Sequence, residues 1–232
     1  MVTNKRILLS QLPTDKLTHD CFSSDEVAVA AAVEGEVVIK TLILSQDAAN
    51  RAWMQGATYR SALAGGDVMA SYGIGEVVES KHASWAVGDL VMADVGWQEY
   101  AVLQGDLVTA VPEHDGPLSH GLSLLGVAGL TAYHGLINVA GIHAGETLLV
   151  SAAAGSVGSI VGQIGRIKGA RVIGIAGGDE KCRWVENELG FDACINYKSS
   201  EQSLRDQLQA VAPRGIDVYF DNTGGDILRS QS

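Results

Sequence analysis

The chain has 232 residues, of which 47% are hydrophobic and 28 are glycine, so it is long enough to bury one large core or two smaller ones. Its formal net charge is −11 and it contains no run of Lys or Arg, which argues against nucleic acid and anionic membranes as partners. No apolar run reaches the ~18 residues that span a bilayer, and no N-terminal segment resembles a signal peptide. Because the three cysteines follow no pattern, we expect a cytoplasmic protein.

The first 125 residues predict a β-rich domain. Short segments rich in β-branched residues lie at 35–44, 73–78, 88–92 and 98–103, separated by Gly and Asp, and this region shows no helical period. The pattern then becomes helical from residue 118 to residue 140, which predicts a helix that leads into a second domain. We therefore expect a β-rich substrate domain over 1–125 and a nucleotide-binding domain over 126–232, with the substrate in the cleft between them.

A segment in the second domain has the layout of a dinucleotide site. An apolar strand pattern at 147–150 is followed by a turn of small residues and then by a helical apolar pattern. Gly155 would let the backbone turn tightly and approach a pyrophosphate, Gly158 would let helix and strand pack closely, and the helix N-terminus would supply free N–H groups. Ala153 stands where the usual pattern has its first glycine. The alternative is an ordinary glycine-rich turn between strand and helix.

The next segment favours NADP over NAD. A second buried strand pattern at 171–175 completes a βαβ unit of about the required 30 residues. An NAD site would place Asp or Glu about 20 residues past the glycines, on the ribose 2′-hydroxyl. Here the strand runs into Gly177 and Gly178, which leave room for a 2′-phosphate that Lys181 and Arg183 could pair with. The alternative is that Lys181 is a solvated helix residue.

Strand and helix patterns continue to alternate beyond this unit. Apolar strand patterns at 191–195 and 216–220 enclose a helical pattern, and this alternation predicts a doubly wound parallel sheet. Ligands of such sheets bind beyond the carboxyl ends of the strands, where Asn222, Gly224 and Gly225 would lie. Ordinary turn chemistry would explain the same residues.

Five segments together resemble the medium-chain dehydrogenase/reductase superfamily: 126–133, 152–158, 176–182, 196–198 and 221–225. Within it the chain most resembles the zinc-free branch of prostaglandin reductases, leukotriene B4 12-hydroxydehydrogenase and bacterial curcumin reductases. The resemblance implies a GroES-like N-terminal domain followed by a Rossmann-type parallel sheet. It also implies that NADPH delivers hydride to the β-carbon of an α,β-unsaturated ketone or aldehyde, with quinone reduction as an alternative on the same scaffold.

The resemblance also implies roles for single residues. Lys181 and Tyr197 would hold the 2′-phosphate region, Asn222 would hold the nicotinamide end, and Thr131 would lie near the nicotinamide and the substrate. Tyr59 is a candidate for lining the substrate pocket. The full set of expected cofactor-binding residues is Ala153, Gly155, Ser156, Val157, Gly158, Gly178, Lys181, Tyr197 and Asn222.

Two departures from the family concern the substrate, and one concerns zinc. Residues 47–51 read Asp-Ala-Ala-Asn-Arg where the family has Asp-Pro-Tyr-Met-Arg, and Ala128 stands where relatives often carry Pro. The zinc-dependent relatives carry Gly-His-Glu in a region that corresponds to 65–72, which here contains neither Cys nor His. Since the three cysteines also lack zinc-ligand spacing, we expect no metal site.

The resemblance extends to residue 228, whereas family members continue with a sixth strand, substrate-pocket residues and a return to the first domain. We therefore expect an incomplete Rossmann-type domain, and we assign no catalytic residue. The homodimer of full-length relatives uses that sixth strand, which these 232 residues lack. A non-catalytic NADPH-binding remnant is the alternative function. We expect the 232 residues alone to be marginally stable and to have little or no reductase activity.

Overall fold

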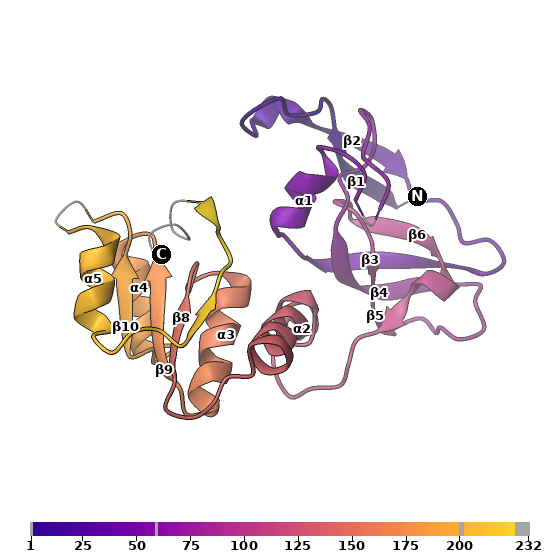
Figure 1. Cartoon of the computed structure of the whole chain (residues 1–232). Coiled ribbons are helices and arrows are strands. Elements are labelled where there is room, and N and C mark those ends of the chain that lie inside the picture. The colour runs from indigo at the N-terminus through magenta and orange to yellow at the C-terminus, as the bar shows by residue number, and fades with distance from the viewer. Residues whose placement is uncertain (1, 59, 200–201, 226–232) are drawn as a thin grey trace. The chain divides into compact units, whose positions relative to one another are not determined.

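The computed structural model describes residues 2–58, 60–199 and 202–225. The chain divides into two compact units, Met1–Leu122 and Ser123–Ser232 (Figure 1). None of the helices in the described residues is long and apolar enough to cross a membrane.

The first unit is built from antiparallel strands. Its main sheet has the order β6-β3-β4-β5-β7, and β1 pairs with β2 in a sheet of two strands. The strands are β1 (Thr3–Leu9), β2 (Phe22–Ala28), β3 (Glu36–Leu44), β4 (Tyr72–Ser80), β5 (Leu90–Asp94), β6 (Tyr100–Gln104) and β7 (Thr109–Ala110). Side chains such as Ile39, Val77 and Val91 are fully buried and form the core of the main sheet. The four predicted segments form β3 to β6, with ends within two residues of those expected.

The absence of a helical period in this region did not reveal α1 (Ala48–Trp53). This helix has only six residues, too few for a hydrophobic period to emerge, and it begins at a capping box. The Asp47 side chain accepts a hydrogen bond from the N–H of Ala49 (2.7 Å), while Asn50 accepts one from the N–H of Asp47 (2.8 Å). Three short 3-10 turns complete the unit: η1 (His19–Cys21), η2 (Gly105–Leu107) and η3 (Leu118–Gly121).

The second unit is a parallel sheet with helices on both faces, as the alternating pattern predicts. Its strand order is β10-β9-β8-β11, and every pair of neighbours is parallel. In chain order its elements are α2 (Val127–Tyr133), the π-helix η4 (His134–Ala140), β8 (Thr147–Val150), α3 (Ser156–Ile167), β9 (Arg171–Ala176), α4 (Asp179–Asn187), β10 (Ala193–Asn196), α5 (Leu204–Val211) and β11 (Val218–Phe220). The fold class is therefore mixed α/β, with a GroES-like antiparallel unit followed by a Rossmann-type unit.

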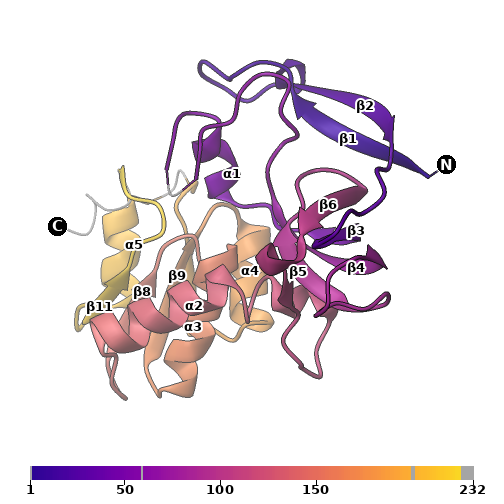
Figure 2. The same ribbon diagram turned by 90° about the vertical axis from the view of Figure 1, so that its right-hand side faces the viewer.

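Alternate side chains of the central strands enter different cores. Leu148 and Val150 of β8 pack with α2, η4 and α3, whereas Leu149 packs with residues of α5. The same alternation places Val172 of β9 in the first core and Ile173 in the second. All five side chains are fully buried, so both faces of the sheet are covered. Figure 2 views this unit from the face that α2 and α3 cover.

The predicted helix over 118–140 forms in pieces. The 3-10 turn η3 comes first, and α2 then continues into the π-helix η4, which ends at Gly141 in a left-handed conformation (φ +64°). Gly135 allows this helix to lie close to β11, because a Cβ atom there would be only 2.6 Å from the ring of Phe220. π-Helical turns are frequent at functional sites.

Candidate functional site

The turn between β8 and α3 presents free backbone N–H groups. Gly155 is the N-cap of α3 and contributes no side-chain cap. The N–H groups of Ser156, Val157 and Gly158 donate to no acceptor among the described residues. Unpaired N–H groups and the positive end of the helix dipole make such a turn suitable for an anion.

Only small residues fit this turn. A Cβ atom on Gly158 would lie 2.3 Å from the carbonyl oxygen of Ala152, and one on Gly155 would lie 3.0 Å from the same atom. Ala152 itself has φ +48°, which is unusual for a residue with a side chain. Ala153 is fully buried, and its Cβ leaves no room for a side chain on Gly174 of β9. The backbone at the end of β8 is therefore closely packed against α3 and β9.

The ends of β9 and β10 form a second feature around Gly177. β9 and β10 are paired so that Asn196 lies opposite Ala176. This register brings the next residues of β10 against the glycines that follow β9. A Cβ atom on Gly177 would lie 3.0 Å from the hydroxyl of Tyr197 and 3.1 Å from Cε of Lys198. Gly178 follows with φ +114°, a conformation that favours glycine, and begins α4 without a side-chain cap.

Asn196 holds this second feature together. Its Oδ1 accepts hydrogen bonds from the N–H of Gly178 (2.8 Å) and of Lys198 (3.0 Å), and its Nδ2 donates to Asp179 (2.7 Å). The Nζ atom of Lys198 lies 6.0 Å from the ring centre of Tyr197. Lys181 is exposed in the first turn of α4. Neither lysine forms an ion pair within the described part of the chain, so both positive charges are available to a ligand.

The end of β11 carries the third feature, a hydrogen-bonded turn anchored on Ser151. Ser151 is fully buried, and its hydroxyl donates to Asp221 (2.9 Å) and accepts from the N–H of Asn222 (2.7 Å). The side-chain amide of Asn222 donates to the carbonyl of Ser151 (2.9 Å). Asp221 also accepts hydrogen bonds from Tyr219 (2.8 Å) and from the N–H of Gly224 (3.0 Å). Asn222 is therefore fixed beside the β8–α3 turn.

These bonds determine the ionisation of Asp221. Burial raises the pKa of its carboxyl group, but the hydrogen bonds from Gly224, Thr223, Tyr219 and Ser151 outweigh burial and lower the pKa from 3.8 to about 2. Burial and the neighbouring Asp221 also raise the pKa of Tyr219, so its hydroxyl remains a donor. The carboxylate is thus charged at neutral pH.

We expect the turn at 221–225 to open in acid. Because the folded state lowers the pKa of Asp221, its contribution to stability is complete above the unfolded value near 4 and is lost as the pH falls towards about 2. An NMR titration of the Gly224 amide should show a transition in this range. Asp221→Asn removes the titrating group, and a transition that persists in this variant would contradict the assignment.

The structure gives fewer contacts for the remaining predicted residues. Thr131 is exposed on α2, which packs against α3, and its position near a nicotinamide stays a prediction. Tyr59 lies outside the described residues. Arg183 is exposed on α4. No role was predicted from the sequence for Lys198, Asn196 or Ser151, although Asn196 and Lys198 belong to the family-like segment 196–198 and Ser151 directly precedes the segment 152–158.

No three His, Cys, Asp or Glu side chains among the described residues gather closely enough to hold a metal ion. All three cysteines are free thiols. Burial raises the pKa of two of them, Cys182 and Cys194. They are therefore neutral at physiological pH.

The three features lie in a row, because the carboxyl ends of parallel strands meet at one edge of a sheet. The strand order β10-β9-β8-β11 places the lysine and tyrosine feature first, the free N–H groups next and Asn222 last. A ligand that spans the row would have an anionic group at one end and another near its middle. A dinucleotide with a 2′-phosphate has this order of groups.

Comparisons with known proteins agree with this geometry. A family model described as the N-terminal domain of oxidoreductase matches residues 5–111, and one described as zinc-binding dehydrogenase matches residues 156–231. Among curated proteins, the NADPH-dependent curcumin reductase of Escherichia coli is 39% identical over 97% of this chain and 65% of its own length. Prostaglandin reductase 1 of Bos taurus is 41% identical over 90% of this chain and 62% of its own length. The NADP(+)-dependent 2-alkenal reductase of Nicotiana tabacum is 37% identical over 98% of this chain and 68% of its own length. The chain thus spans about two thirds of the length of these relatives.

Solved structures give the same result. The structure of CurA from Vibrio vulnificus in complex with NADPH superposes with a TM-score of 0.90 and 37% identity, over 97% of this chain and 67% of the other. A second structure of that protein gives a TM-score of 0.88 and 38% identity.

Proposed function

The chain belongs to the medium-chain dehydrogenase/reductase superfamily, in the branch that includes the curcumin and prostaglandin reductases, and from this premise we propose that it binds NADPH and reduces the carbon–carbon double bond of α,β-unsaturated ketones or aldehydes. The observation that carries the proposal is the row of three features along the carboxyl edge of the parallel sheet. Their order matches the order of phosphate, diphosphate and nicotinamide in the cofactor.

The residues present fit the cofactor. The free N–H groups at Ser156, Val157 and Gly158, behind the cap at Gly155, would hold the diphosphate, and the small side chain of Ala153 keeps the turn close to the sheet. A side chain on Gly158 would collide with the backbone behind it, so glycine there keeps the N–H groups of α3 close to the sheet.

The 2′-phosphate would lie near Gly177 and Gly178. Tyr197 and Lys198 lie beside Gly177, and Lys181 stands in the first turn of the helix that Gly178 begins. Two lysines without ion pairs among the described residues and a phenol hydroxyl therefore support this assignment. The nearest acidic residue of this loop, Asp179, is hydrogen-bonded to Asn196. A charge-assisted contact with phosphate is stronger than a neutral hydrogen bond, which supports a preference for NADPH over NADH.

The chemistry itself belongs to the cofactor, which supplies a hydride when bound. The work left to this chain is to hold the nicotinamide end in place, and Asn222 is suited to this because Ser151 fixes it from two sides. We retain Thr131 and Tyr59 as candidate substrate contacts. We also place the protein in the cytoplasm, supported by its three free cysteines.

Two measurements test the proposal separately. Fluorescence titration should show tighter binding of NADPH than of NADH, and NADPH oxidation should depend on an added enone such as 2-cyclohexenone or curcumin. Equal affinity for the two cofactors would contradict the assignment of a 2′-phosphate site. Tight NADPH binding with oxidation by a quinone but not by an enone would replace the substrate class while leaving the cofactor assignment intact.

A further inference from the structure

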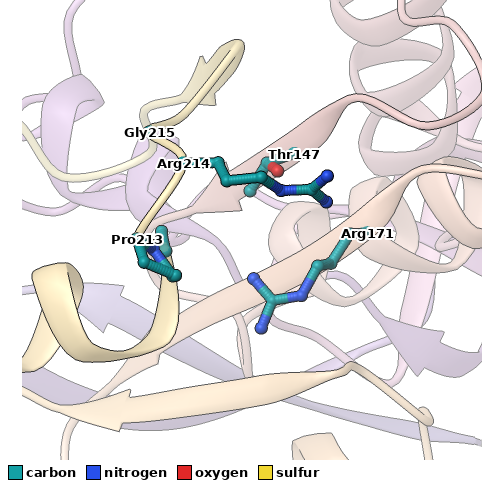
Figure 3. Close-up of a pocket in the computed structure, with 6 residues that line it drawn as sticks. Thr147, Arg171, Pro213, Arg214 and Gly215 are labelled. Atoms are coloured by element: carbon teal, nitrogen blue, oxygen red, sulfur yellow. The ribbon is translucent and has the colours of Figure 1, made fainter.

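A hollow lies at the amino edge of the parallel sheet in the second unit, opposite the carboxyl edge that carries the candidate nucleotide site. Thr147 and Arg171 are the first residues of β8 and β9, so they lie at the amino ends of the strands, away from the candidate nucleotide site. The hollow has a volume of about 230 Å³ and is lined by Thr147, Arg171, Ala212, Pro213, Arg214 and Gly215 (Figure 3). We propose that it binds a small phosphate-bearing anion between Arg171 and Arg214, independently of the proposed reductase function.

A fixed turn presents Arg214. The N–H of Gly215 donates to the carbonyl of Ala212 (3.0 Å), which closes a turn with Pro213 and Arg214 at its two central positions. Proline at the first central position restricts the backbone, and Gly215 then adopts φ +91°, which favours glycine. The turn therefore holds the backbone of Arg214 in place. Figure 3 shows its side chain crossing the hollow from the turn.

Arg171 enters the hollow from the opposite side and is anchored. Its Nη1 donates to the carbonyl of Val211 (2.6 Å), the last residue of α5. This bond satisfies one of the free carbonyls at the negative end of the helix. The other guanidinium nitrogens of Arg171 have no partner among the described residues.

The charges around the hollow favour an anion. Neither Arg171 nor Arg214 forms an ion pair within the described ranges. Asp217, two residues past Gly215, has its carboxylate bonded to the N–H of Thr147 (2.8 Å). Among the described residues that line the hollow, Arg171 and Arg214 are the charged ones, in a chain whose formal charge is −11. Positive side chains without ion-pair partners in an acidic protein are suited to an external anion.

The arrangement suits phosphate better than a carboxylate. Guanidinium groups bind both anions through paired N–H donors, but here the two groups approach from opposite sides of the hollow. A tetrahedral anion offers oxygen atoms in both directions, whereas a planar carboxylate offers them in one. The volume of about 230 Å³ is several times the ~30 Å³ share of a liquid water molecule, so a phosphate group with a small substituent fits.

Inorganic phosphate is the probe for this site. A titration of the whole chain followed by amide NMR, at constant ionic strength, should give saturable shifts at Thr147, Arg171 and Gly215. Arg214→Ala should weaken these shifts about tenfold or more in apparent Kd. Arg205→Ala, which removes the same charge from an exposed position on α5, should leave them unchanged.

Four outcomes would overturn the proposal. One is the absence of saturable shifts at these amides up to tens of millimolar phosphate, and another is an equal loss in the Arg214 and Arg205 variants. The third is that acetate shifts the same amides with the same apparent Kd as phosphate, which would contradict the assignment of phosphate as the ligand class. Phosphate that shifts only Ser156, Val157 and Lys181 would contradict this site and support the nucleotide site instead.

Discussion

Replacing Lys181 with alanine is expected to weaken NADPH binding by about ten- to a hundredfold while leaving NADH binding unchanged. A charge-assisted hydrogen bond to phosphate contributes about 1.5 to 3 kcal/mol, and NADH lacks the phosphate that Lys181 would contact. The exposure of Lys181 and the presence of Lys198 at the same loop favour the lower end of this range. Fluorescence titrations with both cofactors, at fixed ionic strength, measure the effect.

Lys168→Ala is the matched control. Lys168 is an exposed lysine of the same unit, at the far end of α3 from the free N–H groups, so its loss changes the net charge equally without touching the site. If the Lys168 variant loses as much NADPH affinity as the Lys181 variant, the effect is one of net charge. If the Lys181 variant loses affinity for NADH to the same extent, Lys181 does not contact the 2′-phosphate.

Lys198 shows which part of the site the sequence could predict. The glycines after β9 and the lysine that follows them are close in sequence, so their spacing alone indicated a phosphate position. Lys198 reaches Gly177 only because β9 and β10 pair in parallel with Asn196 opposite Ala176. That register is a property of the assembled sheet, and no local pattern reveals it.

Ser151 was missed for a similar reason. Its hydroxyl joins Asp221 and Asn222, which are 70 and 71 residues later in the chain. The contact exists because β11 pairs with β8, although three helices and two strands separate them in sequence. A small polar residue in a glycine-rich turn gave no sign of this long-range role.

The strands of the second unit were easier to predict. β8 is a continuous run of buried apolar residues, and its bounds match the predicted segment 147–150. The pair β1 and β2 in the first unit was not predicted. β2 reads Phe-Ser-Ser-Asp-Glu-Val-Ala and has no fully buried residue, so it lacks the apolar alternation that identifies a strand.

Gly158→Ala is expected to destabilise the second unit by about 1 to 3 kcal/mol and to abolish measurable NADPH binding. The added Cβ would lie 2.3 Å from the carbonyl oxygen of Ala152 and 3.1 Å from Cα of Ala153. Both are backbone atoms, so relief requires α3 to move away from β8, and Ala152 already has φ +48°. Movement of α3 would displace the free N–H groups that we assign to the diphosphate.

Urea unfolding, followed by the NMR signals of the amides of residues 147–176, measures the free energy of unfolding of the second unit by itself. Gln163→Ala is the control, because Gln163 is exposed on the same helix and its replacement should change stability by no more than about 0.5 kcal/mol. A Gly158 variant as stable as this control would mean that the turn adapts without moving α3. A variant that is destabilised but still binds NADPH with unchanged affinity would contradict our assignment of the N–H groups of α3 to the cofactor site.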